Sequence, residues 1–185
     1  MKAILYDRIK NVTAHRKSRD DNKDFVLAHR EYLGDLIRFS FDAKDPDSHK
    51  ACWILEFVSY QEVAWLQPHL DFICNNLGGL KDESAIRPIA KVCQLLVVSN
   101  FKNPREILLS QNHLQQITEA CFDWLINDTK VASKVYSMRT LFILGKHSDW
   151  IYPELRIILE KDSRLHSAAY KVGAREILKK LTQIT

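Results

Sequence analysis

The sequence predicts an all-α chain, an α-α superhelix (solenoid) of about four helical hairpins preceded by an N-terminal capping helix. Apolar residues recur at helical spacing from residue 30 onward, and no segment shows the alternation of a strand. The 185 residues include only five Gly and five Pro, too few for the turns of a β-sandwich. The helical blocks come in pairs repeated every 34 to 46 residues, a period typical of helical repeats. We therefore expect one domain over residues 1–185.

The N-terminal segment, residues 1–29, is dense in charge. It is expected to form a polar helix that covers the end of the repeat stack. Its charge density equally allows it to be partly disordered. The two alternatives remain open from the sequence.

The first helical pair is expected at 30–42 and 48–60. Four apolar residues fall on one face of the first helix, as the core-facing side of an amphipathic helix requires: Leu33, Leu36, Ile37 and Phe41. The turn between the two helices contains a proline, which disfavours helical geometry in the residue before it.

Three further pairs complete the four expected over 30–182. They are predicted at 65–77 with 83–99, 111–127 with 129–147, and 149–161 with 163–182. One aspartate stands in the turn inside each pair, at similar spacing: Asp47, Asp82, Asp128 and Asp162. Residues 100–112 interrupt the array and are a candidate recognition loop.

Two copies of the frame Trp-x-x-Pro-x-Leu, "WLQPHL" from Trp65 and "WIYPEL" from Trp150, mark the same structural unit. Proline is tolerated in the first turn of a helix, because the amide it lacks would have no partner there. Each frame therefore predicts a helix start, with its Trp packed on the previous pair. Leu70 and Leu155 are expected to face the core.

The blocks "SHKACWILEF", "SAIRPIAKVCQLL", "ITEACFDWLIND" and "SDWIYPELRIILEKD" carry a resemblance. From residue 30 to about 182 the chain resembles the HEAT and armadillo class of helical repeats. More closely, it resembles a family of short bacterial all-helical proteins, some of which bear the name adenylosuccinate lyase. The resemblance implies the superhelical fold and very little chemistry.

Adenylosuccinate lyase activity itself is not expected. The lyases resemble one another in a longer chain with a catalytic loop of the form Ser-Ser-x-Met-Pro-x-Lys-x-Asn. The two methionines here, Met1 and Met138, do not precede a proline. Phosphate-binding glycine loops, serine nucleophile elbows and zinc-binding His-Glu-x-x-His motifs are also missing from the sequence. We therefore nominate no catalytic residue, cofactor or metal ligand.

Charge is the most informative functional signal. The predicted first helices carry a net charge of −5 and the second helices +9. Second helices commonly line the concave face of such arrays, so their cations are expected to form a basic ridge there. Lys171, Arg175 and Lys179 must share one stripe, because residues four apart lie on one side of a helix. The full candidate set is Lys130, Lys134, Arg139, Lys171, Arg175 and Lys179. The same residues could equally be solvating charges.

The leading interpretation is a non-catalytic interaction module that binds a macromolecular partner, most naturally a protein with an acidic surface, on its concave face. The alternative is a nucleic-acid-binding protein, since one class of bacterial alkylpurine DNA glycosylases is built from HEAT-like repeats with a basic face. Base excision would need an aromatic side chain beside an exposed carboxylate. Trp124 beside Asp123 is the one pair nominated, although core packing of Trp124 explains it as well. The oligomeric state is left open.

Four cysteines, each in an apolar stretch and without metal-binding spacing, are expected to be buried free thiols: Cys52, Cys74, Cys93 and Cys121. His69 and His147 each have an aspartate two residues away, a spacing that points to different sides of a helix, so they are expected to be surface or turn residues. No apolar stretch is long enough to span a bilayer, and no signal peptide is recognisable. We expect a cytoplasmic protein without membrane contact.

Overall fold

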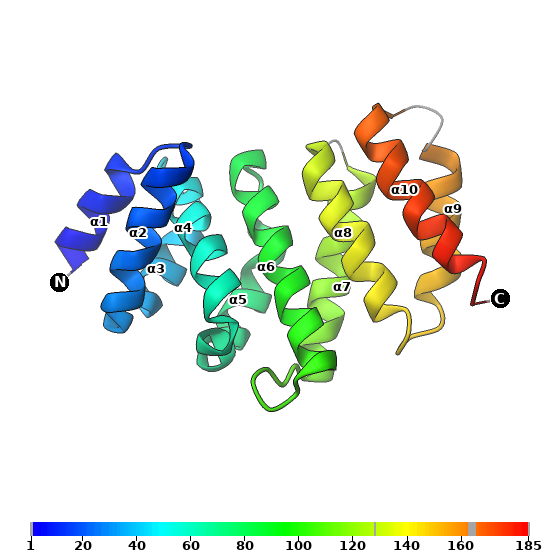
Figure 1. Cartoon of the computed structure of the whole chain (residues 1–185), viewed down its shortest axis with the longest axis horizontal. Coiled ribbons are helices and arrows are strands. Elements are labelled where there is room, and N and C mark those ends of the chain that lie inside the picture. The colour runs from blue at the N-terminus through cyan, green and yellow to red at the C-terminus, as the bar shows by residue number, and fades with distance from the viewer. Residues whose placement is uncertain (1, 128, 163–165, 185) are drawn as a thin grey trace.

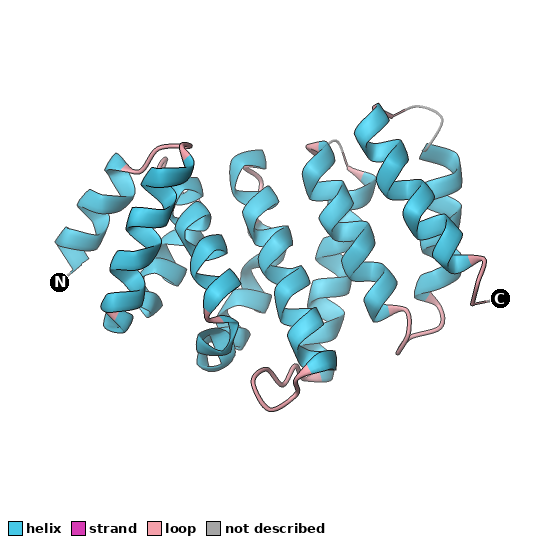
Figure 2. Ribbon diagram, viewed as in Figure 1, coloured by secondary structure: helices cyan, strands magenta, loops and turns pink. Residues whose placement is uncertain are grey.

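The computed structural model describes residues 2–127, 129–162 and 166–184. Within these ranges the chain is all-helical and contains no strand (Figure 2). The predicted all-α class is therefore confirmed. None of the described helices combines the length and the apolar character needed to cross a membrane.

The helices follow one another with short connections. The α-helices are α1 (Lys2–Asn11), α2 (Arg16–Ala28), α3 (Leu33–Ser40), α4 (Ser48–Gln61), α5 (Leu70–Asn76), α6 (Glu83–Lys102), α7 (Gln111–Ile126), α8 (Val131–Leu144), α9 (Ile151–Asp162) and α10 (Ala168–Leu181). Short 3-10 turns, η1 (Arg30–Tyr32), η2 (Val63–His69) and η3 (Leu77–Gly79), flank α3 and α5.

The helices form a row with the two termini at opposite ends (Figure 1). The even-numbered helices make one layer, because α2 packs on α4, α4 on α6, α6 on α8 and α8 on α10. Helices α3, α7 and α9 lie behind this layer in the view of Figure 1 and pack on its members. The layer of α2, α4, α6, α8 and α10 therefore has one side turned away from the other helices.

The N-terminal segment differs from the expectation of a single capping helix. It forms two helices, α1 and α2, and α2 extends the even-numbered layer by one more member. Leu5, Ile9 and Val26 anchor these helices in the core with at most 1% of their surface exposed. The apolar positions are few, but they are spaced so that each helix buries one stripe.

The segment 100–112 is only partly a loop. Helix α6 continues to Lys102, and α7 begins at Gln111, so the irregular stretch between them is shorter than predicted. Ile107 within this stretch is fully buried, and the Asn100 side chain accepts a hydrogen bond from the amide of Leu109 at 2.8 Å. The loop is thus fastened to the core at its centre and its end.

The two Trp-x-x-Pro-x-Leu frames behave alike at their leucines and differ at their tryptophans. Leu70 and Leu155 are both buried, as predicted. Trp65 packs partly buried against the core. Trp150 stacks on Phe122 of the preceding helix pair, with ring centroids 5.6 Å apart, yet 57% of its surface stays exposed. The expected packing on the previous pair is therefore present at Trp150, but only one face of that ring is covered.

The aspartates expected in the turns play different parts. Asp82 is the N-cap of α6 and accepts a hydrogen bond from the amide of Ser84 at 2.8 Å. Asp47 precedes α4 without a side-chain cap bond, and Asp162 is the last residue of α9. Asp128 lies outside the described residues. The best cap belongs to α7, where Ser110 and His113 form a reciprocal capping box.

The buried side chains form one continuous core that runs from Leu5 in α1 to Leu181 in α10. Each helix contributes apolar residues to it, so neighbouring helices bury one another's apolar stripes. Neighbouring helices therefore depend on one another for the burial of their apolar side chains.

Candidate functional site

Lys134, one of the predicted ridge residues, is buried and has 2% of its surface exposed. Its ammonium donates hydrogen bonds to the carbonyl oxygens of Leu125 at 2.8 Å and Asn127 at 2.7 Å, at the C-terminal end of α7. These carbonyls have no partner inside their own helix, and a cation stabilises that end of the helix dipole. Lys134 therefore caps the C-terminal end of α7, and its predicted place in an exposed basic ridge is wrong.

Lys130 and Arg139 differ in their place on α8, since Lys130 precedes the helix and Arg139 lies within it. Lys130 is the exposed residue just before the helix, and its backbone amide donates to the Glu83 carboxylate. Arg139 is half-buried and its guanidinium forms an ion pair with Glu176 of α10 at 2.7 Å. Of the predicted set, Arg139 is therefore the residue that lies between two helices of the even-numbered layer.

Lys171, Arg175 and Lys179 do share a stripe on α10, but the stripe faces away from α8. Gly173 marks the side of α10 that touches α8, because a Cβ added there would lie 3.1 Å from Val135. Lys171 and Arg175 are two residues before and after Gly173, so each lies about 160° round the helix axis from Gly173, on the side opposite α8. These three residues are here called the α10 stripe. The structure does not bring it together with Arg139.

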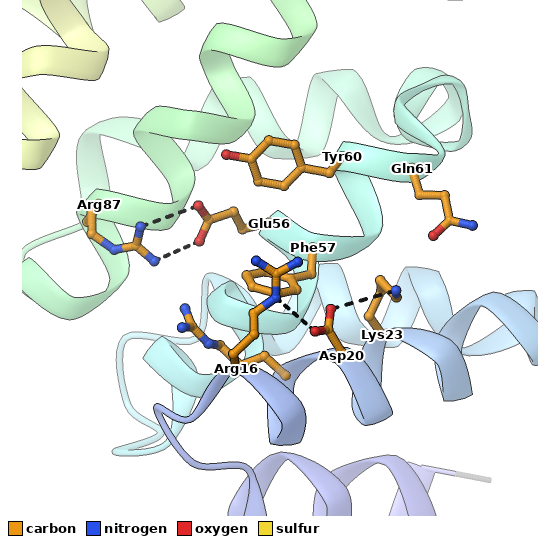
Figure 3. Close-up of a pocket in the computed structure, with 9 residues that line it drawn as sticks. Arg16, Asp20, Lys23, Glu56, Phe57, Tyr60, Gln61 and Arg87 are labelled. Atoms are coloured by element: carbon orange, nitrogen blue, oxygen red, sulfur yellow. Dashed lines mark hydrogen bonds and ion pairs between the residues drawn. The ribbon is translucent and has the colours of Figure 1, made fainter.

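A different group of charges gathers at the other end of the same layer. A pocket of about 590 Å³ lies between α2, α4 and α6 (Figure 3). We call it the α2–α4–α6 pocket, and its lining contains four cations, two carboxylates and two aromatic rings. The lining residues are Arg16, Arg19, Asp20, Lys23, Glu56, Phe57, Tyr60, Gln61 and Arg87.

Glu56 and Arg87 form the wall of the pocket between α4 and α6. The two guanidinium nitrogens of Arg87 reach the two carboxylate oxygens of Glu56 at 2.7 and 3.3 Å, a bidentate pair (Figure 3). Glu56 is only 3% exposed. Burial raises the pKa of the Glu56 carboxyl, and Arg87 opposes that rise because it favours the charged form. The pair therefore holds a buried charge that burial alone would disfavour.

Arg16 and Arg19 project from α2 over the ring of Phe57. Their guanidinium carbons lie 4.8 and 4.9 Å from the ring centroid, within the range of cation–π contacts. Arg16 also pairs with Asp20 at 2.8 Å, and Asp20 lies 3.8 Å from Lys23 (Figure 3). The buried Nε of Arg19 has no hydrogen-bond partner in the described chain. Arg19 is thus the pocket cation with unused donor capacity.

The charges continue from this pocket along the layer. The Lys91 ammonium lies between two rings, 5.2 Å from the centroid of Tyr60 and 5.0 Å from that of Tyr136. Lys180 pairs with Glu176, which also holds Arg139, and sits 5.7 Å from the ring of Phe142. We define the cationic face as the α2–α4–α6 pocket together with Lys91, Tyr136, Arg139, Phe142, Glu176 and Lys180.

The pair nominated for base excision does not form a site. Trp124 is 4% exposed and belongs to the core, while Asp123 on the next position of α7 is exposed. The core-packing explanation of Trp124 is therefore the one the structure supports. Within the α2–α4–α6 pocket, Glu56 is a carboxylate beside aromatic rings, but both of its oxygens are engaged by Arg87.

The other candidate chemistries are also accounted for by packing. All four cysteines are free and buried, as expected. His147 stacks on Phe101 with ring centroids 3.8 Å apart, and His69 is partly buried, which lowers its pKa together with nearby arginines. No group of three or more potential metal ligands occurs among the described residues.

Sequence reasoning missed the N-terminal half of this face because α2 was treated as a cap. A signal was present, since Arg16, Arg19 and Lys23 are spaced at i, i+3 and i+7 and must share one side of a helix. The partner positions are also on one side of their helices, because Glu56 and Tyr60 in α4, and Arg87 and Lys91 in α6, are each spaced i, i+4. The sequence does not show which helices pack on one another, so it could not predict that these residues lie close together.

Comparison of the chain with protein-family models, with curated proteins and with solved structures finds no match.

Proposed function

We propose that the protein is a non-catalytic interaction module, a HEAT- or armadillo-type superhelix that binds an acidic segment of a partner protein on its cationic face. The observation that carries the proposal is the run of cations along the even-numbered layer, from Arg16 in α2 to Lys180 in α10. Extended repeat surfaces are suited to binding an elongated partner, because each helix adds one row of side chains.

The face is mixed in charge, which favours a protein over a nucleic acid. Asp20, Glu56 and Glu176 stand between the cations at intervals along it. A nucleic-acid backbone presents a phosphate at every step, so it would meet these carboxylates as well as the cations. A peptide can place acidic residues opposite the cations and polar or apolar ones elsewhere. Charge complementarity of this kind gives specificity and fast association.

Aromatic residues add a second reason to expect partner contact. Tyr60 is 53% exposed on this face. Aromatic and arginine side chains are enriched at the centres of protein interfaces because they bury much area at small entropic cost. The cation–π contacts to Phe57, Tyr60, Tyr136 and Phe142 hold both partners of each contact in place before binding.

Nucleic-acid binding is the second candidate, favoured by the same cations and by the exposed ring of Tyr60. The experiment that separates the two measures binding of the protein to poly-glutamate, to duplex DNA and to single-stranded DNA by fluorescence anisotropy over a salt series. The proposal expects binding to poly-glutamate that weakens with salt, and weaker binding to either DNA at every salt concentration. Tight DNA binding with a steep salt slope, and none to poly-glutamate, would replace the protein partner with a nucleic acid.

A further inference from the structure

The α2–α4–α6 pocket has more positive than negative charge and an incomplete set of partners. Four cations line it against two carboxylates. Arg87 is committed to Glu56 on both of its bridging nitrogens, and Arg16 is paired with Asp20. Lys23 is paired at the rim with Asp24, which lies outside the lining and is 65% exposed. Arg19 alone among these cations has no carboxylate within ion-pair distance in the described chain.

Two of the three guanidinium groups of the pocket, those of Arg19 and Arg87, are positioned by buried neighbours. Arg19 lies over Phe57, which is only 9% exposed, and Arg87 is fixed by the buried Glu56. The Arg16 side chain is 77% exposed and is oriented by Asp20 and by its contact with Phe57. A planar guanidinium in a fixed position can offer two parallel N–H donors to an oxyanion. Pre-organised donors increase affinity, because little side-chain entropy is lost on binding.

We propose that this pocket binds a phosphate monoester, carried on a phosphorylated side chain of the partner protein, with Arg19 and Arg16 as its main ligands and Lys23 as a further cation. The proposal rests on the proposed function and names the group that the partner presents at this end of the cationic face. A phosphate monoester carries a charge of about −1.5 to −2 and three strong acceptor oxygens, so it matches the excess charge of the lining better than one carboxylate does.

A phosphorylated side chain asks less of the pocket than a nucleotide does, because the ring of Phe57 is already covered and only that of Tyr60 is open. Both Arg16 and Arg19 lie over Phe57, whereas Tyr60, with Lys91 5.2 Å from its ring centroid, keeps 53% of its surface exposed. A nucleobase would need an open ring face on which to stack. A phosphorylated serine or threonine side chain needs charge and donors only, which are what the pocket offers.

The test uses three fluorescent five-residue peptides that differ at the central position, with phosphoserine, glutamate or serine between flanking glutamates. Binding to the full chain is measured by anisotropy at constant ionic strength. The proposal expects the phosphoserine peptide to bind roughly tenfold more tightly than the glutamate peptide, since its oxyanion can accept more charge-assisted hydrogen bonds. Equal affinity for these two peptides would overturn it. Adenosine monophosphate is the competing probe, and its binding as tightly as the phosphoserine peptide would also overturn the assignment to a peptide.

Two substitutions in the pocket should act in opposite directions. Arg19→Gln should weaken binding of the phosphoserine peptide by roughly tenfold, because one charged donor pair is lost. Asp20→Asn should strengthen it by a few-fold, because it removes a repelling carboxylate and releases Arg16. Arg175→Gln on the α10 stripe has the same charge change as Arg19→Gln and should leave the affinity unchanged. Circular dichroism establishes that each variant is folded. Weaker binding of the phosphoserine peptide by Asp20→Asn, or equal losses of affinity in Arg19→Gln and Arg175→Gln, would refute a specific phosphate site.

Failure of this proposal is distinguishable from failure of the proposed function. Poly-glutamate reports on the whole cationic face and contains no phosphate. Binding of poly-glutamate without preference for the phosphoserine peptide would overturn the phosphate site and leave the acidic-partner proposal standing. Binding of neither would overturn both.

Discussion

Removing one member of the Glu56–Arg87 ion pair should destabilise the protein, and removing Arg87 should cost more stability than removing Glu56. Glu56 is 3% exposed, whereas 27% of the Arg87 side chain reaches solvent. Arg87→Met leaves a buried carboxylate without its partner, while Glu56→Met leaves an arginine that can turn toward water. Loss of one partner of a buried pair costs about 3–5 kcal/mol, and water access at Arg87 reduces this to about 2–3 kcal/mol for Arg87→Met. Glu56→Met should cost about 1 kcal/mol or less.

The double variant Glu56→Met with Arg87→Met should be close to the wild type, because an apolar pair of similar volume often replaces a buried ion pair without loss. The assay is urea denaturation followed by circular dichroism at 222 nm. For a chain of this size the Arg87→Met variant should also melt about 5–10 °C lower. Additive costs in the double variant, or a larger cost for Glu56→Met than for Arg87→Met, would refute the reasoning.

The pH dependence gives an independent check on the same pair. Burial raises the pKa of Glu56 and Arg87 lowers it, so in Arg87→Met that pKa should rise further. The folded variant then binds the proton more tightly than the unfolded chain does, and its stability must fall as the pH rises through the folded-state pKa. The cost of Arg87→Met should therefore be smaller near pH 5 than near pH 8. An unchanged or larger cost at the lower pH would contradict a buried, charged Glu56.

Three further predictions concern the fold. Lys134→Met should destabilise the protein by about 2 kcal/mol in urea denaturation, because two charged hydrogen bonds to α7 carbonyls are lost. Lys171→Met on the α10 stripe should cost less than about 0.5 kcal/mol. Equal costs for the two variants would contradict the capping role of Lys134. Gly145→Ala should destabilise the protein by about 1–3 kcal/mol, because the added Cβ would overlap the ring of Tyr152. Gly34→Ala, whose Cβ has room, should stabilise α3 by up to about 1 kcal/mol. A stabilising Gly145→Ala would contradict the close packing of Gly145 on Tyr152. Burial raises the pKa of the Cys74 and Cys121 thiols to about 12, so Ellman's reagent at pH 8 should react with the cysteines only after unfolding, and rapid reaction of a native thiol would contradict their burial.

The helices were predictable because the apolar spacing that buries them is local. Spacing alone placed Leu33, Leu36, Ile37 and Phe41 on one face. The first three are buried, whereas Phe41 follows the end of α3 and is only partly buried. Residues 2–28 were harder, since Leu5, Ile9 and Val26 are separated by polar stretches and give a weak periodic signal. Their burial depends on packing against α4, which lies outside the local sequence.

The candidate site was less predictable, because its residues meet only across helices. Lys134 and Arg139 carry the same formal charge on one helix, but one caps α7 from the interior and the other pairs with α10. Spacing places a residue on a side of its own helix and does not say which neighbour that side meets. The α10 stripe illustrates the limit, since its three cations align as predicted but face away from α8.

The most direct test of the central claim compares two variants with the same change in net charge. One replaces Lys91, Arg139 and Lys180 of the cationic face with glutamine, and the other replaces Lys171, Arg175 and Lys179 of the α10 stripe with glutamine. Binding to poly-glutamate is measured for both by anisotropy at low salt. The account predicts a loss of roughly tenfold or more for the face variant and little change for the stripe variant, because specific complementarity rather than net charge decides the affinity. Equal losses, or a larger loss for the stripe variant, would contradict the cationic face as the binding surface.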